Sequence, residues 1–132
     1  MTMIVLKSAK GTIRLRDTDM AIVSAASSLS GQDFGVDAQD TPSFVLGYLD
    51  HKRRYRTVNS SHCGSLQVET LSQGDKRLVR GVFSGIHDMD IVLTLTALAA
   101  PDSDYIDFSV ELDNRSGEQV IDIQYPFLLY AM

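Results

Sequence analysis

The sequence predicts an all-β protein, an antiparallel β-sandwich built as a single domain over residues 1–132. Apolar residues recur at every second position in short segments along the whole chain, which is the periodicity of strands with one buried face. Clusters of Gly, Asn, Asp, Ser and Pro separate these segments and supply turn chemistry. No composition break, repeat or low-complexity run divides the chain. Short strands separated by turns are typical of an antiparallel sandwich.

The N-terminal segments are expected to form strands at 3–6 and 12–16. Residues 17–29 are ambiguous, because an Asp or Thr at their start would cap a helix with apolar residues on one side. The β-branched pair Ile22 and Val23 favours a strand instead, and the serines that follow weaken a helix. We therefore prefer the strand interpretation.

The middle of the chain predicts a loop, a hairpin and a second loop. Residues 30–43 collect Ser, Gly, Gln, Asp and Pro and should form the first loop. A strand over 44–48, a tip at 50–52 and a return strand over 53–58 form the expected hairpin. Residues 59–64 should then form the second loop.

Three further strands are expected before residue 100. The first covers 66–70 and turns at 72–75, and the second covers 78–83. Gly81 interrupts the second strand, which indicates a bulge or a close backbone approach. The third covers 89–97 and has the strongest alternation in the sequence, with Met, Ile, Leu, Leu and Ala on one face.

The stretch from 104 to 126 predicts a β-hairpin. A strand over 106–113 alternates apolar and polar residues, 114–118 supply the turn, and a second strand over 121–125 ends before Pro126. Six side chains from this hairpin and the preceding strand are expected to fill the core: Phe108, Val110, Leu112, Leu93, Leu95 and Ile123.

Charge and composition argue against several classes of partner, among them nucleic acid and membranes. The net charge of −5 argues against nucleic acid and anionic membranes. The basic run 51–56 does not change this, because alternation along a strand splits it between two faces where cross-strand carboxylates can pair with it. The single cysteine, Cys63, cannot form an internal disulfide. No signal peptide or 20-residue apolar span is visible, so the expected protein is soluble and, by default, cytoplasmic.

The sequence shows no catalytic or metal-binding constellation. The candidate acids alternate with core residues, as a solvated outer face would: Glu69, Asp90, Glu111 and Asp122. His62, Cys63 and His87 lack the paired spacing of a zinc site. We therefore predict no catalytic residue, no metal and no cofactor.

The segment 107–117, followed by 120–126, resembles the N-terminal β-sandwich domain of large glycoside hydrolases, the galactose-mutarotase-like supersandwich. The resemblance lies in an alternating strand that ends in Asn114, a following strand that ends in Tyr125-Pro126, and the Thr/Leu alternation of 91–96. It implies a non-catalytic, carbohydrate-associated module that precedes a catalytic barrel. The His and Glu of mutarotases have no identifiable counterparts in this sequence.

Ligand contact is predicted for polar residues near strand ends, since Arg and Tyr combine directional donors with a flat stacking surface. These residues are His51, Arg53, Tyr55, His87, Asp88 and Arg115. Two alternative functions remain open at this point. One is a small sugar-active enzyme, mutarotase- or hydrolase-like. The other is an oligomeric interaction domain that associates through strand edges and the apolar segment 127–132.

Overall fold

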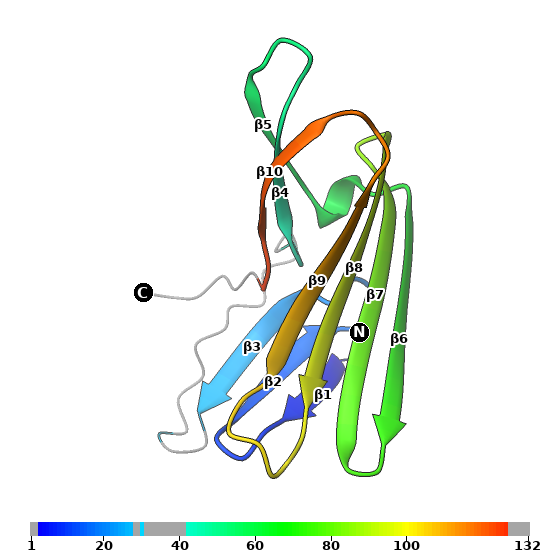
Figure 1. Ribbon diagram of the computed structural model, residues 1–132. Helices are drawn as coiled ribbons and strands as arrows, with labels where there is room; N and C mark the ends of the chain where they lie inside the picture. The colour runs from blue at the N-terminus through cyan, green and yellow to red at the C-terminus, as the bar shows by residue number, and fades with distance from the viewer. Residues whose placement is uncertain (1–2, 28–29, 31–41, 127–132) are drawn as a thin grey trace.

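The computed structural model describes residues 3–27, 30 and 42–126, and these residues form ten strands in three antiparallel sheets (Figure 1). The first sheet contains β1 (Met3–Lys7), β2 (Gly11–Arg16) and β3 (Ile22–Ser27) in that order. The second, four-stranded sheet contains β6 (Ser65–Gln73), β7 (Lys76–Ile86), β8 (Met89–Ala99) and β9 (Asp107–Asn114). The third has the order β10 (Gln119–Gln124), β4 (Val45–Leu49), β5 (Tyr55–Asn59). The predicted all-β antiparallel architecture is confirmed.

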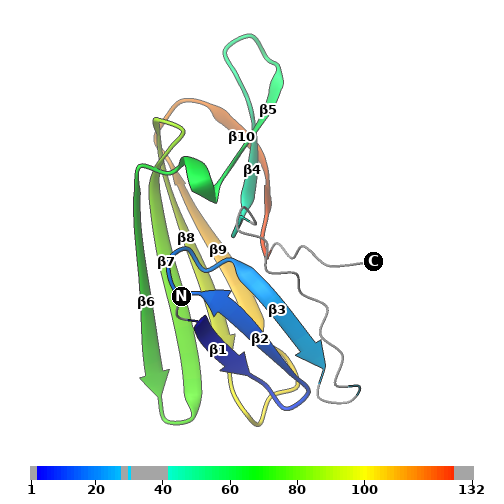
Figure 2. The same cartoon turned by 180° about the vertical axis from the view of Figure 1, so that it is seen from behind.

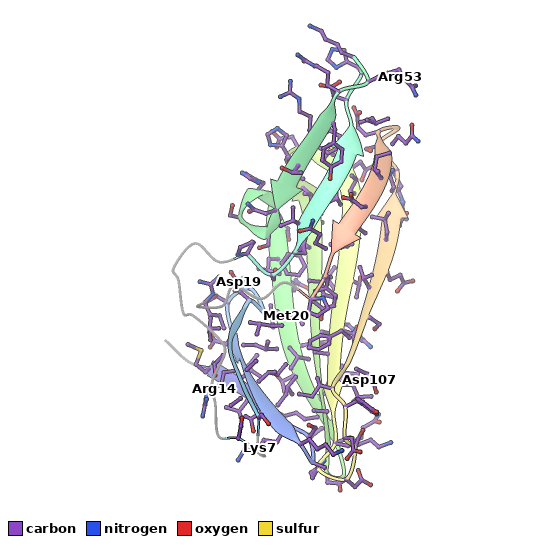
Figure 3. The ribbon with its side chains drawn as sticks, turned by 90° about the vertical axis from the view of Figure 1, so that its left-hand side faces the viewer. Lys7, Arg14, Asp19, Met20, Arg53 and Asp107 are labelled. Atoms are coloured by element: carbon purple, nitrogen blue, oxygen red, sulfur yellow. The ribbon has the colours of Figure 1, made fainter. Side chains whose placement is uncertain are left out.

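The two three-stranded sheets pack on the same face of the four-stranded sheet. Figures 1 and 2 show β1–β3 against one half of that sheet, while β4 and β5 extend past its other end. Met20, which follows β2, points between the layers toward the four-stranded sheet (Figure 3) and is 2% exposed. Phe44, just before β4, packs edge-on against Phe83 of β7 with ring centroids 5.0 Å apart. One core therefore joins all three sheets.

The central strand β8 has the alternation that the sequence predicts. Ile91, Leu93, Leu95 and Ala97 are fully buried, while the residues between them are only partly covered. Because β8 pairs with β7 on one side and β9 on the other, its inner face lies in the middle of the core. The strand interpretation of 17–29 is confirmed for 22–27, which form β3, whereas 17–19 form a turn and 28–29 lie outside the described residues.

Gly81 permits a close approach between layers. A side chain at this position would lie 2.5 Å from the sulfur of Met20 and 2.9 Å from the ring of Phe83. The irregularity of β7 lies further along, between Ser84 and Ile86, where Gly85 has a φ of +62°. Gly81 is therefore not at a bulge, and what approaches it closely is side chains rather than backbone.

The predicted hairpin over 104–126 is wrong in its pairing. β9 pairs with β8, and β10 pairs with β4 in another sheet. The turn chemistry itself is as expected: the Asn114 side chain donates to the carbonyl of Glu118 at 2.7 Å, and Gly117 has a φ of +81°. These local bonds reverse the chain, but they do not decide which strand each arm joins.

The predicted core is correct at its centre and wrong at its edge. Leu93 and Leu95 are fully buried, whereas Phe108 and Ile123 are only half-buried. Val110 is 44% exposed and Leu112 is 38% exposed. All three β9 residues share the inner face of the sheet with β8, but β9 is an edge strand and the opposite layer covers it less than the centre.

Several boundaries also differ from the predicted ones. The return strand of the β4–β5 hairpin begins at Tyr55 rather than at residue 53, because Asp50 holds residues 50–54 in a loop in which Arg53 has a φ of +60°. β6 continues to Gln73, so the turn after it is shorter than expected. The predicted loop 59–64 contains a 3₁₀ turn, η1 (Ser60–His62). Most of the predicted loop 30–43 and the apolar segment 127–132 lie outside the described residues.

Candidate functional site

A cleft of about 550 Å³ lies where the β4–β5 hairpin, η1 and the β7–β8 turn come together. Figure 1 shows these segments at the same end of the molecule, with the β9–β10 connection beside them. The cleft contains all three histidines of the chain and two arginines. Its lining residues are Tyr48, Asp50, His51, Arg54, Arg56, Thr57, Val58, His62, His87, Met89 and Glu118.

Asp50 organises one wall of this cleft. Its Oδ1 accepts the backbone N–H groups of Lys52 at 2.8 Å and Arg54 at 2.9 Å. Its Oδ2 accepts the Nε–H groups of Arg54 and Arg56, both at 3.2 Å. The Arg54 N–H, the Arg56 guanidinium and the Lys52 N–H all favour the ionised carboxylate, and they hold the pKa of Asp50 well below its usual range despite some desolvation. Asp50 is therefore a fixed negative charge.

Arg54, at the end of the loop, and Arg56 of β5 lie on the same side of the hairpin, since both guanidiniums bond the same oxygen of Asp50. Arg56 pairs directly across from Tyr48 of β4, whose side chain is 8% exposed and forms part of the cleft wall. Each guanidinium uses Nε on Asp50. Within the described part of the chain, no hydrogen bond engages their terminal Nη groups. Those donors remain for a ligand.

His62 is held by the cap of η1. Its Nδ1 accepts the backbone N–H of Asn59 at 3.1 Å, so the hydrogen of the neutral ring is on Nε2, which can donate. Its backbone carbonyl accepts the N–H of His87 at 2.8 Å. The two imidazole rings meet edge to face, 5.8 Å between centroids. This bond and the ring contact fix the β7–β8 turn against η1.

The opposite face of the hairpin carries a separate polar contact. The hydroxyl of Tyr55 donates to Asp122 of β10, at 3.0 Å to Oδ1 and 3.1 Å to Oδ2. The ring passes over Gly47 of β4, where a side chain would overlap the Tyr55 hydroxyl and the Asp122 carboxylate. This hydrogen bond raises the pKa of Tyr55, since ionisation would place two anions together.

The six predicted ligand residues gather at one end of the molecule but do not share one surface. His51 and His87 line the cleft. Arg53 lies at the tip of the hairpin (Figure 3) and lines a second hollow of about 300 Å³ with His51 and Glu118. Tyr55 lies on the opposite face of the hairpin, as described above.

The remaining two predicted residues lie near the cleft without lining it. Asp88 follows His87 in the β7–β8 turn with a φ of +63°. Arg115 pairs with Asp113 at 2.9 Å, and its backbone N–H donates to the carbonyl of Asp90.

Sequence reasoning missed Arg54, Arg56, His62 and Glu118. The two arginines were within reach of the sequence, because alternation alone places them on one face of the return strand. His62 and Glu118 are brought in by η1 and by the β9–β10 connection, which carry no sequence signal for contact with the hairpin.

The described residues offer neither a metal-binding group nor an activated cysteine thiol at the site. In residues 3–27, 30 and 42–126, no three His, Cys, Asp or Glu side chains are grouped to hold a metal ion. The thiol of Cys63 donates to the carbonyl of Ser60 at 2.8 Å, and burial raises its pKa. Both features disfavour the thiolate, which is the nucleophilic form of a cysteine.

Comparison with known proteins identifies no relative: no protein-family model matches this sequence, and no curated protein matches it. Among the residues whose structure is described, no helix is long and apolar enough to cross a membrane.

Proposed function

We propose that this chain is a non-catalytic carbohydrate-binding β-sandwich module that binds sugar in the cleft between the β4–β5 hairpin and η1. The observation that carries the proposal is the convergence of directional donors on one small cleft: the Nη groups of Arg54 and Arg56 and the Nε2 of His62. Sugar hydroxyl and ring oxygens are acceptors for such groups.

The size and walls of the cleft support a small saccharide. A volume of about 550 Å³ falls within the range of small-molecule sites, roughly 300–1,000 Å³. Tyr48 and Met89 give the cleft an apolar surface beside its polar groups. A sugar needs both, because its C–H faces pack on apolar side chains while its hydroxyls form hydrogen bonds. The resemblance to supersandwich domains of glycoside hydrolases adds the expected setting, a module that accompanies a catalytic domain.

The state of the carboxylates supports a binding role over hydrolysis. Glycoside hydrolysis generally uses two carboxyl groups, one of which must deliver a proton. Asp50 is ionised and bonded to both arginines, which leaves Glu118 as the other carboxylate lining the cleft. Turnover of aryl glycosides, or faster mutarotation of galactose, would instead support the sugar-active enzyme.

A second candidate function, association between chains, is favoured by the apolar edge of the sandwich. β9 is an edge strand, and Val110 and Leu112 on it are 44% and 38% exposed. Unpaired edges with exposed apolar residues are templates for pairing with another strand. Sedimentation over a range of concentrations tests this candidate, and a protein that stays monomeric when concentrated would contradict it.

Isothermal titration calorimetry with a panel of neutral and acidic oligosaccharides tests sugar binding. We expect at least one sugar to bind, and the double variant Arg54→Ala/Arg56→Ala to weaken its affinity at least tenfold. Arg80→Ala is the matched control, because Arg80 pairs with Glu69 away from the cleft. Thermal melting of each variant separates loss of binding from loss of fold. A panel with no binding at millimolar concentration contradicts the proposal.

A further inference from the structure

We propose that the sugar recognised by this cleft is acidic, and that Arg54 and Arg56 together bind its carboxylate or sulfate group. This inference depends on the proposed function and narrows it to one substrate class. The way in which Asp50 holds the two guanidiniums, and the charges around them, support it.

The two guanidiniums are held close together by a single oxygen. Both Nε atoms lie 3.2 Å from Oδ2 of Asp50, which holds the two guanidinium groups near each other at one wall of the cleft. An arginine bonded through Nε to one carboxylate still has two terminal groups with four N–H donors. Two guanidiniums side by side can use these terminal N–H groups to bind an oxyanion other than Asp50, such as a carboxylate or sulfate, with two hydrogen bonds each.

Asp50 does not compete with the ligand for those donors. Its two oxygens already accept four hydrogen bonds, two from backbone N–H groups and two from the arginines. With four hydrogen bonds already accepted, Asp50 orients the two guanidiniums. Carboxylates that accept hydrogen bonds from ligand-binding side chains do the same in other sites. Arg54 and Arg56 are therefore oriented before a ligand binds.

The rest of the lining is also rich in donors. His51, His62 and His87 all face the cleft, and His62 has its Nε2–H available. The charged groups that line the cleft are Arg54, Arg56, Asp50 and Glu118. The lining has two carboxylates. Asp50 is bonded to both arginines, so repulsion of an acidic ligand comes mainly from Glu118, which belongs to the β9–β10 connection.

The test compares matched acidic and neutral sugars by calorimetry at low salt. One pair is an oligogalacturonide and its methyl ester, and the other is a galactose 6-sulfate and galactose. We expect the acidic member of one pair to bind at least tenfold more tightly than its neutral partner. Which pair shows the difference distinguishes a carboxylate from a sulfate ligand. The preference should shrink in 0.5 M NaCl, because exposed charges are screened.

The variants Arg54→Gln and Arg56→Gln remove the charge but keep hydrogen-bonding capacity. Each should reduce the preference for the acidic sugar, and Arg80→Gln should leave it intact. Arg56→Lys restores charge without the planar fork and should recover part of the affinity. If a Gln variant melts early, the Lys variant and the comparison of sugar pairs on the wild-type protein still decide the question.

The outcomes separate this inference from the proposed function. Equal affinity for the acidic and neutral members overturns the inference and leaves sugar binding standing. Binding of inorganic sulfate by the wild-type protein, with no sugar bound, overturns the proposed function and with it the acidic sugar. Failure of all sugars and of sulfate overturns both.

Discussion

Tyr55 donates a hydrogen bond to Asp122 across Gly47, with 3.0 Å between the phenol oxygen and Oδ1. The two residues belong to β5 and β10, which lie on either side of β4 and do not pair with each other. The contact therefore ties together the outer strands of this small sheet, on the face opposite the arginines of the cleft.

Gly47→Ala is expected to break this contact, because the added methyl group would occupy the space of the Tyr55 hydroxyl and the Asp122 carboxylate. The pKa of Tyr55 is raised by the hydrogen bond and charge of Asp122, so it should fall back toward the ordinary value of about 10. Ultraviolet titration of the phenol, with Tyr55→Phe subtracted, measures the change. Asp122→Asn should give the same direction of change.

Gly64→Ala is the control for this substitution, since a side chain at Gly64 would meet only ordinary contacts of 3.5 Å or more. A Tyr55 that titrates identically in wild type and in Gly47→Ala would show that the phenol does not lie over Gly47.

Asp50→Asn is expected to remove a pH-dependent part of the stability of the β4–β5 hairpin. Because the pKa of Asp50 is lower in the folded chain than in the unfolded chain, its stabilisation is fully present above about pH 4 and is lost as the pH falls through the folded value. Melting temperatures of wild type and Asp50→Asn should therefore differ at pH 6 and converge in acid. Carboxylate chemical shifts should show Asp50 still ionised at pH 3. A constant difference in melting temperature across this range would contradict the prediction.

Asp19→Ala is expected to destabilise the fold by about 2–3 kcal/mol, because it removes a carboxylate that bonds a buried guanidinium through both of its oxygens. Arg16 is 5% exposed and bonds both oxygens of Asp19, at 3.1 Å through Nε and 3.0 Å through Nη2. Urea denaturation measures the free energy of unfolding. Asp113→Ala, which breaks the exposed pair with Arg115, is the control and should cost at most about 0.5 kcal/mol. Equal losses in the two variants would mean that the Arg16 pair is not buried in solution.

Phe83→Ala should cost about 3–5 kcal/mol, as expected for a buried ring removed from a packed core. Phe83 is fully buried and contacts Phe44, so its loss opens a cavity between sheets. Phe108→Ala should cost less, about 1–2 kcal/mol, because Phe108 is half-buried on the edge strand and meets Tyr125 on one side. Urea denaturation of both variants gives the comparison, and a larger loss at Phe108 would contradict the described burial.

The candidate site was only partly predictable. His51 and His87 were singled out as residues at strand ends, and both line the cleft. Alternation along the predicted return strand places Arg53 and Tyr55 on one face, but the Asp50 loop takes Arg53 out of the strand and leaves Arg54 and Arg56 lining the cleft. That loop is set by hydrogen bonds from three residues to one carboxylate, a detail that alternation does not encode.

The sequence by itself determined that the chain is all-β and which face of its central strand is buried. It did so because side-chain direction alternates with a period of two whatever the partner strand is. Only the tertiary structure decided that β9 and β10 join different sheets, and hence that Glu118 lies beside His51, Arg54 and Arg56. A turn fixes only the local direction of the chain, whereas strand pairing depends on which apolar faces, far apart in sequence, bury each other best.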